Sequence, residues 1–373
     1  MQRKLRVGIV FGGRSGEHEV SVASARSVMA AIDQTKYEVI PIAIARSGQW
    51  LPGVAPQALM APTDIAPAEA VSSDTPQAVI SDDTPTGFAL LPQLRDEQHA
   101  TEVDVIFPVL HGTYGEDGAL QGMLEMAGLP YVGNGVLGAA LGMDKDKAKL
   151  LFQVAGLPVV PWITVTRKEV ESALDASITA IAARFGFPVF AKPANMGSSV
   201  GVTKAHDAAE LRAALTMAAR YDRKIVVEPA INCREIECGV LGNDDPEASV
   251  VGEILPSNEF YDYQAKYLDG ASQLLIPAPI ADAIALDVRR MAIVAFRALD
   301  LNGLARVDFF LDRDTDQVYL NEVNTMPGFT EISMYPKLWE VSGLTYPALI
   351  DRLIMLGIER HQERARNEIG VDF

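Results

Sequence analysis

The stretch LARVDFFLDRDTDQVYLNEVN, residues 304–324, predicts two strands joined by a polar turn. In strands over Ala305–Asp312 and Gln317–Asn324, side chains point to alternate faces with a period of two. A turn centred on Thr315 makes the two strands an antiparallel pair. The register of that pair decides which polar side chains meet.

This register places Asp308 opposite Glu322 and Arg306 opposite Asn324. Two carboxylates that face each other destabilise a sheet, so a divalent cation between them is the simplest explanation. With Asn324 as a third oxygen ligand, the set suits Mg²⁺ better than zinc. The alternative is an edge hairpin with solvated charges. The alternation also predicts that Arg306 and Asp308 share a face with Phe310, and that Glu322 and Asn324 share one with Leu320.

Bulk composition indicates an ordinary globular chain of two or three domains. It has 373 residues, of which 49% are apolar and 22% charged. A net charge of −17 argues against a protein that coats nucleic acid or anionic membranes. Cys233 and Cys238 match neither a disulfide nor a zinc pattern, and no run is long enough to span a membrane. We therefore expect a cytoplasmic protein.

Apolar runs alternate with helical patterns over residues 1–133, which predicts a Rossmann-like domain with a mainly parallel sheet. Residues 46–100 are rich in Ala, Pro, Asp, Ser and Thr and read as a peripheral insertion, with hairpin-like pieces near 49–51 and 88–91. The predicted strands are Leu5–Phe11, Val39–Ala45 and Val103–Val109, and the predicted helices are Glu19–Ile32 and Leu120–Ala127.

Two further α+β units follow, at 134–228 and 229–373. The fold class expected for the whole chain is α/β, built from α+β domains. The predicted helices are Asp144–Gln153, Lys168–Phe185, Ala208–Arg220, Ala281–Asp300 and one from Tyr346 onward. The predicted strands are Val159–Thr164, Pro188–Lys192, Val200–Lys204 and Lys224–Glu228, and a long loop covers 257–279.

Two segments of the central unit suit a nucleotide. Lys192 ends a strand and precedes a loop of small residues up to Gly201, whose backbone N–H groups could approach a phosphate. It is not a Walker A loop, and an ordinary turn is the alternative. The strand ending at Glu228 leads into Pro229, whose carbonyl could meet an adenine edge, with Glu235 near the ribose; a plain linker is the alternative.

Two glycine loops follow strands of the first unit. Gly12–Glu19 leads into a helix and could hold an anion or polar ligand, but it lacks the G-x-G-x-x-G order of a dinucleotide site. His111 begins the loop His111–Gly118, where it could be either structural or functional.

In this order, the segments resemble the D-alanine–D-alanine ligase family of the ATP-grasp superfamily. The resemblance covers nearly the whole chain outside 46–100. It rests on Gly16–Ser21, His111–Gly118, Met143–Lys145, Lys192–Gly201, Phe260–Tyr267 and Asn321–Thr330. It implies the ATP-grasp fold and a two-step reaction: ATP phosphorylates one D-alanine carboxylate, and the amine of a second D-alanine attacks the acyl phosphate.

The resemblance also implies cofactors and partners: ATP, two Mg²⁺ ions with Mn²⁺ as a substitute, two molecules of D-alanine, and a homodimer formed through the first domain. The product would serve as a peptidoglycan precursor. The implied metal ligands are Asp308, Glu322 and Asn324. The implied nucleotide contacts are Lys145, Lys192, Ser198, Ser199, Glu228, Pro229, Ile231, Glu235, Phe260, Lys266, Phe310 and Asn321. The implied substrate contacts are Glu17, His111, Ser333 and Met334, and the implied catalytic groups are Glu17, Ser198, Tyr267, Arg306 and Gly328.

Tyr267 bears on specificity, because relatives that make D-alanyl-D-lactate lack a tyrosine there; Glu17, Ser198 and Tyr267 would hold the 257–279 lid closed. The lid is expected to be mobile without nucleotide. The alternatives are another ATP-grasp ligase, such as a D-alanine–D-lactate enzyme, and a non-catalytic ATP-binding protein. The latter would be expected to lose Arg306, Asp308, Glu322 or Asn324, and all four are present.

Overall fold

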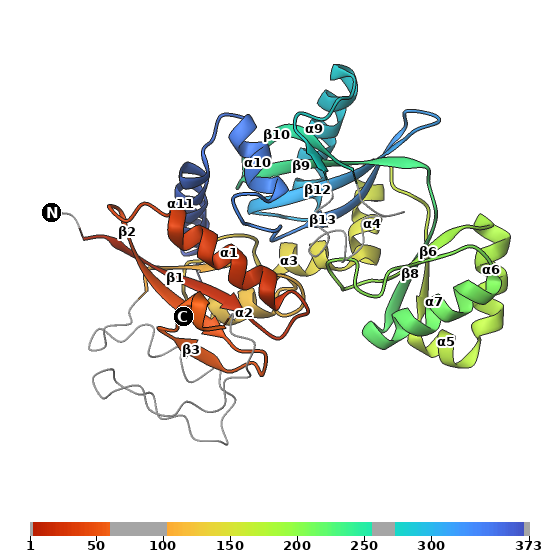
Figure 1. Ribbon diagram of the computed structural model, residues 1–373, viewed down its shortest axis with the longest axis horizontal. Coiled ribbons are helices and arrows are strands. Elements are labelled where there is room, and N and C mark those ends of the chain that lie inside the picture. The colour runs from red at the N-terminus through yellow and green to blue at the C-terminus, as the bar shows by residue number, and fades with distance from the viewer. Residues whose placement is uncertain (1–2, 60–102, 256–272, 369–373) are drawn as a thin grey trace.

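The computed structural model describes residues 3–59, 103–255 and 273–368. Three sheets follow one another along the chain, each with its own helices (Figure 1). The first lies near the N-terminus, the second near the middle of the chain, and the third is formed by later segments. This order agrees with the three α+β units expected from the sequence.

The first sheet is largely parallel, with strand order β3-β2-β1-β4. β1 pairs in parallel with β2 and with β4, and only the edge strand β3 is antiparallel. The central strands read as apolar runs because helices cover both faces of such a sheet. The elements are β1 (Leu5–Gly12), α1 (His18–Ala31), β2 (Tyr37–Ile44), β3 (Trp50–Pro52), the 3₁₀ turn η1 (Pro56–Leu59), β4 (Val105–Pro108) and α2 (Ala119–Met126).

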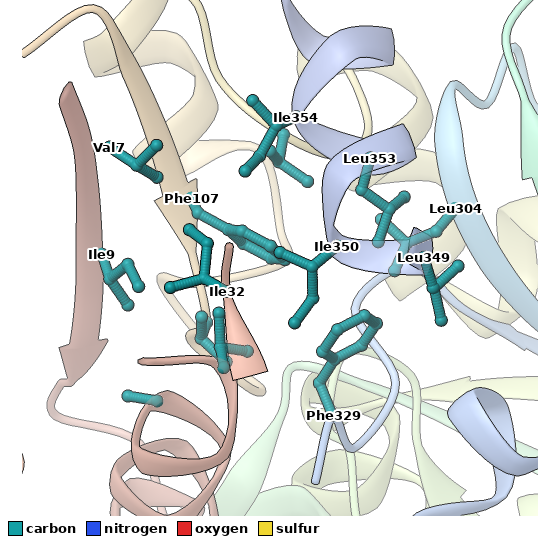
Figure 2. Close-up of a cluster of buried hydrophobic side chains, with 14 of the residues drawn as sticks. Val7, Ile9, Ile32, Phe107, Leu304, Phe329, Leu349, Ile350, Leu353 and Ile354 are labelled. Carbon is teal, nitrogen blue, oxygen red and sulfur yellow. The ribbon is translucent and has the colours of Figure 1, made fainter. Parts of the chain in front are cut away.

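One apolar core ties this sheet to the C-terminal helix α11 (Tyr346–Arg364). Figure 2 shows Phe107 beside Ile350 of α11, with Phe329 below them. The rings of Phe107 and Phe329 meet edge to face at 5.7 Å. The loop that carries Phe329 follows the acidic hairpin, so this core holds the first unit against the third.

The second sheet is antiparallel, in the order β5-β8-β6-β7. Three helices pack on it around a core of aliphatic residues. The elements are β5 (Ile163–Thr166), α5 (Arg167–Ser172), α6 (Leu174–Phe185), β6 (Val189–Pro193), β7 (Thr203–Ala205), α7 (Ala208–Tyr221) and β8 (Lys224–Pro229).

The third sheet is also antiparallel, in the order β11-β10-β9-β12-β13. Helices α4 and α9 share an apolar core with one of its faces. The elements are α3 (Val136–Met143), α4 (Lys145–Val154), β9 (Cys233–Gly242), β10 (Glu247–Leu255), β11 (Gln273–Leu275), α9 (Asp282–Ala298), β12 (Gly303–Asp312), β13 (Val318–Asn324) and α10 (Met334–Val341).

The predicted hairpin is confirmed, including the pairing of Asp308 with Glu322 and of Arg306 with Asn324. A β-bulge shifts the register between Asp308 and Phe309, where Phe309 pairs with Leu320. Between the bulge and the turn, the observed register therefore differs by one residue from the register predicted around Thr315. The extra residue of the bulge restores the predicted pairing at the acids.

The bulge also corrects one predicted face. Leu320 is fully buried in the core with Phe309, whereas Glu322 and Asn324 are only half-buried. The prediction that these three side chains share a face is therefore wrong, because one inserted residue reverses the alternation beyond it. As a result, Asn321 and Glu322, which are consecutive, both line the same cavity.

Four local expectations also need correction. The predicted helix Lys168–Phe185 breaks at Ala173, whose φ of −147° is not helical. β7 starts only at Thr203, because a turn precedes it. Helix α3 was not predicted from its small residues. The predicted strand Val159–Thr164 is divided: Val159 bridges Leu320 of the third sheet, and β5 of the second begins at Ile163.

Among the residues described, no single helix has both the length and the apolar content to cross a bilayer. The pair α10 and α11 passes such a test together, but it is bent by 104°. Its buried residues, such as Leu353 and Ile354, belong to the core shared with the first sheet.

Candidate functional site

A cavity of about 630 Å³ lies between the second and third sheets. Its walls come from the ends of β6 and β8, from β9, β12 and β13, and from the loop before β7. Thirteen of the residues predicted for nucleotide, metal or catalysis line it. They are Lys145, Lys192, Ser198, Ser199, Glu228, Pro229, Ile231, Glu235, Asp308, Phe310, Asn321, Glu322 and Asn324.

Glu228 is the charged centre of one wall. Its side chain is 3% exposed, and two lysines reach it: Lys149 Nζ at 2.6 Å and Lys192 Nζ at 2.7 Å. Burial by itself would raise the pKa of Glu228, but the two lysines lower it to about 2. Glu228 in turn raises the pKa of Lys192 against the effect of burial. This wall therefore keeps an ionised carboxylate and a cationic lysine.

The segment after β8 runs along the cavity. Pro229 pairs with Val189 of β6, and the N–H of Ala230 donates to the carbonyl of Pro188 at 3.0 Å. Pro229, Ala230 and Ile231 then line the cavity before β9 begins. The backbone is thus held against β6 on one side, with the cavity on the other.

The acidic hairpin forms the opposite wall. Arg306 donates two hydrogen bonds to Asp308, Nε to Oδ1 and an Nη to Oδ2, both at 2.7 Å. The amide of Asn324 donates to Asp308 Oδ2 at 2.8 Å. Lys145 Nζ lies 3.3 Å from Glu322. Cations of the protein therefore balance the two facing carboxylates in this state.

The donor set at this wall fits a hard divalent cation. Asp308 and Glu322 offer carboxylate oxygens across one β-pair, and Asn324 adds an amide oxygen while its NH₂ points to Asp308. No group of three or more His, Cys, Asp or Glu residues in the described ranges has the arrangement of a metal site. The fit therefore depends on two carboxylates and one amide, with the remaining ligands coming from water and substrate, as is common for Mg²⁺.

The small-residue loop is held in an unusual backbone conformation. Ser198 and Ser199 have φ values of 48° and 57°, in the left-handed region. Asp222 anchors the start of the loop by accepting from the N–H and side-chain amide of Asn195, at 2.7 and 2.9 Å. Lys145 Nζ donates to the carbonyl of Met196 at 2.8 Å. These contacts hold the two serines over the cavity.

Glu17 connects the first unit to this loop. The hydroxyl of Ser198 donates to Glu17 Oε1, although 181 residues separate them. Glycines stand on both sides of the carboxylate. A Cβ on Gly112 would lie 2.5 Å from Glu17 Oε2, and one on Gly197 would lie 2.9 Å from it. The predicted contact between Glu17 and Ser198 is therefore present, and it is sterically possible because Gly112 and Gly197 have no side chains.

His111 is buried and bonded through both ring nitrogens. Nδ1 lies 2.8 Å from the carbonyl of Met326, and Nε2 lies 3.1 Å from Ser24 Oγ. Ser24 also accepts from the N–H of Phe329 at 3.3 Å. A neutral ring that donates from Nδ1 and accepts at Nε2 satisfies this network, and burial lowers the pKa of His111 accordingly. His111 thus ties α1 to the loop after β13.

Glu116 forms a second link between these units. Its carboxylate accepts from the N–H of Gly112 at 2.6 Å and from the N–H of Met326 at 3.0 Å, and it also lines the cavity. Burial, then the charge of Glu17, raises the pKa of Glu116 to about 8. The link joins the loop His111–Gly118 directly to the segment that follows Asn324.

Two further predicted residues, Gly328 and Ser333, lie in the loop after β13, and a third, Met334, is the first residue of α10. Gly328 and Ser333 are neighbours, since a Cβ on Gly328 would lie 3.4 Å from Ser333 Oγ. Ser333 precedes α10 and accepts from the N–H of Thr330 at 3.1 Å. The side chain of Met334 is buried with Ile254, so only its backbone could contact a substrate. None of these three lines the large cavity.

Three predicted residues, Phe260, Lys266 and Tyr267, lie outside the described residues. The same holds for the predicted lid 257–279 up to residue 272 and for most of the insertion 46–100. At its described end the predicted loop is wrong, because Gln273–Leu275 form β11 against β10. Of the insertion's predicted hairpin pieces, the one near 49–51 is confirmed as β3.

Sequence reasoning missed three residues at the site: Lys149, Glu237 and Glu116. Helical spacing could have identified Lys149, because it lies four residues after Lys145 on α4 and so on the same face. Alternation could have identified Glu237, two residues after Glu235 on β9. Glu116 had no such signal, since its partners are distant in sequence.

Two family models match most of the chain. A model described as the D-ala D-ala ligase N-terminus matches residues 6–134, and one described as the D-ala D-ala ligase C-terminus matches residues 151–355. A D-alanine–D-alanine ligase from Acetivibrio thermocellus is 48% identical, with 98% of this chain and 99% of the relative covered. One from Heliobacterium modesticaldum is 50% identical, with 98% and 97% covered.

Solved structures agree in fold. The D-alanine–D-alanine ligase from Coxiella burnetii matches with a TM-score of 0.79 and 34% identity, covering 98% of this chain and 97% of that one. The VanG D-Ala:D-Ser ligase from Enterococcus faecalis matches with a TM-score of 0.77, also at 34% identity, covering 95% and 100%. The α/β fold of this chain is therefore the ATP-grasp fold predicted from the sequence. Full-length similarity of this kind shows that the chain is an enzyme and belongs to the D-alanine–D-alanine ligase family.

Proposed function

We propose that this enzyme joins two D-alanines to D-alanyl-D-alanine at the expense of ATP, through a D-alanyl phosphate, in peptidoglycan precursor synthesis. The single observation that carries the proposal is the pair of facing acids, Asp308 and Glu322, which line a cavity of about 630 Å³ while Arg306 donates to Asp308. Full-length relatives with this name support it.

The nucleotide is proposed to occupy the large cavity. The Pro229 carbonyl and the Ile231 N–H would meet the adenine edge, with Glu228 beside it and Glu235 toward the ribose. Lys145 and Lys192, with Ser198 and Ser199, would face the phosphates. Phe310 and Asn321 complete these walls. Phe260 and Lys266 remain proposals from the sequence.

Asp308, Glu322 and Asn324 would hold two Mg²⁺ ions, or Mn²⁺ in their place. When bound, these ions would offset the charge of the transferred phosphoryl group. The protein's own contribution is orientation. The β12–β13 pair holds the acids on one wall, with Lys145 of α4 3.3 Å from Glu322 and Lys192 of β6 paired with Glu228. A carboxylate is a poor electrophile, so phosphorylation supplies the leaving group that the second amine needs.

The first D-alanine is proposed to lie near Glu17, which would orient its ammonium, with His111 holding the surrounding loops. Arg306 and the N–H of Gly328 would stabilise the oxyanion of the tetrahedral intermediate, an effect typically worth about 3–4 kcal/mol. Ser333 and the backbone of Met334 would meet the carboxylate of the second D-alanine.

Several finer assignments are also part of this proposal. The domains would be 1–133, 134–228 and 229–373, with the lid 257–279 over the nucleotide and Tyr267 holding it shut with Glu17 and Ser198. The enzyme would act as a homodimer in the cytoplasm, where ATP is available. The fold leaves the second substrate open, because a D-Ala:D-Ser ligase matches as well as a D-Ala:D-Ala ligase does.

The decisive experiment combines substrate choice with one variant. Phosphate release from ATP should require D-alanine and should not respond to L-alanine; D-serine and D-lactate, varied with pH, define the second-site preference. Glu322→Gln should nearly abolish this release while the far-UV spectrum and melting temperature stay close to wild type. Near-normal turnover by the variant would remove Glu322 from the metal site.

A further inference from the structure

Three acids lie side by side across the third sheet. In the register of β9 and β12, Glu237 pairs with Asp308, and Asp308 in turn pairs with Glu322 of β13. Three carboxylates at one level of a sheet repel one another unless cations or donors lie among them. Only Asp308 and Glu322 have a role in the proposed function, so Glu237 calls for an explanation.

Arg306 lies between two of these acids. Its Nε is 2.7 Å from Asp308 Oδ1 and 2.9 Å from Glu237 Oε2. The residue paired with Arg306 on β9 is Gly239, and a Cβ there would meet Trp339 Nε1 at 2.9 Å. Arg306 is therefore held by one carboxylate on its own strand and one on the neighbouring strand.

The two acids differ in exposure. The side chain of Glu237 is 4% exposed, against 14% for Asp308 and 15% for Arg306. Asp308 is thus the more accessible of the two carboxylates and can bind a cation, whereas Glu237 is almost fully buried. A buried carboxylate interacts more strongly with a guanidinium than an exposed one does.

We propose that Glu237 is a positioning residue, which holds Arg306 in place when a divalent cation binds Asp308. This inference rests on the proposed function. Without Glu237, the guanidinium would shift toward Asp308, compete with the cation there, and lose the orientation that the oxyanion requires. With Glu237 present, Asp308 can bind the cation while Glu237 keeps its ion pair with Arg306.

The test measures Mn²⁺ binding to the full-length enzyme with the ATP analogue AMP-PNP, by electron paramagnetic resonance of free Mn²⁺. Glu237→Gln should weaken binding by about tenfold, as for other residues that orient a metal ligand. In an Arg306→Met background, which has no guanidinium to compete, the same change should have little effect. Glu237→Asp keeps the charge and should fall between the wild type and Glu237→Gln.

Glu253→Gln is the matched control. Glu253 is also buried in this sheet and also pairs with an arginine, since it accepts from Arg234 at 2.7 and 2.6 Å. Its loss should lower stability without weakening Mn²⁺ binding. For turnover, Glu237→Gln should reduce kcat by about tenfold or more even at saturating ATP and Mg²⁺, because Arg306 acts on the reacting group.

The outcomes separate the two proposals. If Asp308→Asn binds Mn²⁺ as the wild type does, the metal assignment fails, and this inference fails with it. If Asp308→Asn loses Mn²⁺ but Glu237→Gln does not, only the inference is overturned. Equal loss from Glu237→Gln in the wild-type and Arg306→Met backgrounds also overturns it, because the effect would then not act through the arginine.

Discussion

Lys149→Met tests whether both lysines are needed to stabilise the ionised carboxylate of Glu228 in the folded protein. The two lysines lower the pKa of Glu228 from 4.5 to about 2. At about 1.4 kcal/mol per unit, this shift corresponds to roughly 3 kcal/mol of stabilisation. Removing a sole partner from a buried ion pair costs about 3–5 kcal/mol. The loss here should be smaller, about 2 kcal/mol, because Lys192 remains and because burial lowers the pKa of Lys149, so that its charge is itself costly to bury.

The loss should depend on pH in a defined direction. Because the pKa of Glu228 is lower in the folded state, its ion pairs stabilise the fold above the ordinary pKa of 4.5, and that stabilisation disappears as pH falls toward 2. The difference in stability between wild type and Lys149→Met should therefore be full near pH 7 and should shrink below about pH 4.5.

Urea unfolding, followed by tryptophan fluorescence, measures this difference. Trp162 is a suitable reporter, because Lys149 Nζ lies 5.7 Å from the centre of its ring. Lys147→Met is the control, since that side chain is 53% exposed on the same helix. The reasoning is refuted if Lys149→Met and Lys147→Met have the same urea midpoint, or if Lys149→Met and Glu228→Gln are strictly additive.

The remaining predictions concern the loops around Glu17. Gly112→Ala should reduce kcat/KM for D-alanine by about a hundredfold, because the new Cβ would lie 2.5 Å from Glu17 Oε2 and the φ of +75° disfavours alanine. Initial rates measure this, and wild-type kinetics in the variant would contradict it. The pKa of Glu116 is about 8 in the folded protein and about 4.5 when unfolded, so its contribution to stability should be lost as pH rises from about 4.5 to 8. Glu116→Gln should remove this part of the pH dependence. Melting temperatures across the range test it, and an unchanged slope would refute it. Asp222→Ala should raise the KM for ATP several-fold with little change in melting temperature, because Asn195 loses its anchor; an unaltered KM would count against that role.

Much of the fold was accessible from local sequence patterns. The alternation of strand and helix predicted the parallel first sheet, and the period of two in residues 304–324 predicted the Asp308–Glu322 pair. The bulge in β13 was missed, although the apolar spacing changes from two residues between Val318 and Leu320 to three between Leu320 and Val323. Its effect was to place Leu320 in the core and to turn Asn321 toward the cavity.

The sequence by itself determined which chemical groups are available. Arg306, Asp308, Glu322 and Asn324 lie on one hairpin, whose pairing depends on a turn only a few residues long. Local structure of this kind can be read from neighbouring residues, because side-chain direction in a strand follows from position along the chain.

Only the tertiary structure decided which distant groups meet. It joined Glu17 to Ser198, placed Lys149 and Lys192 on the two oxygens of Glu228, and brought Glu237 to Arg306. These contacts join separate sheets or elements far apart in the sequence, and burial strengthens their charges by removing water. No local pattern encodes such contacts, because they depend on how elements distant in the sequence pack together.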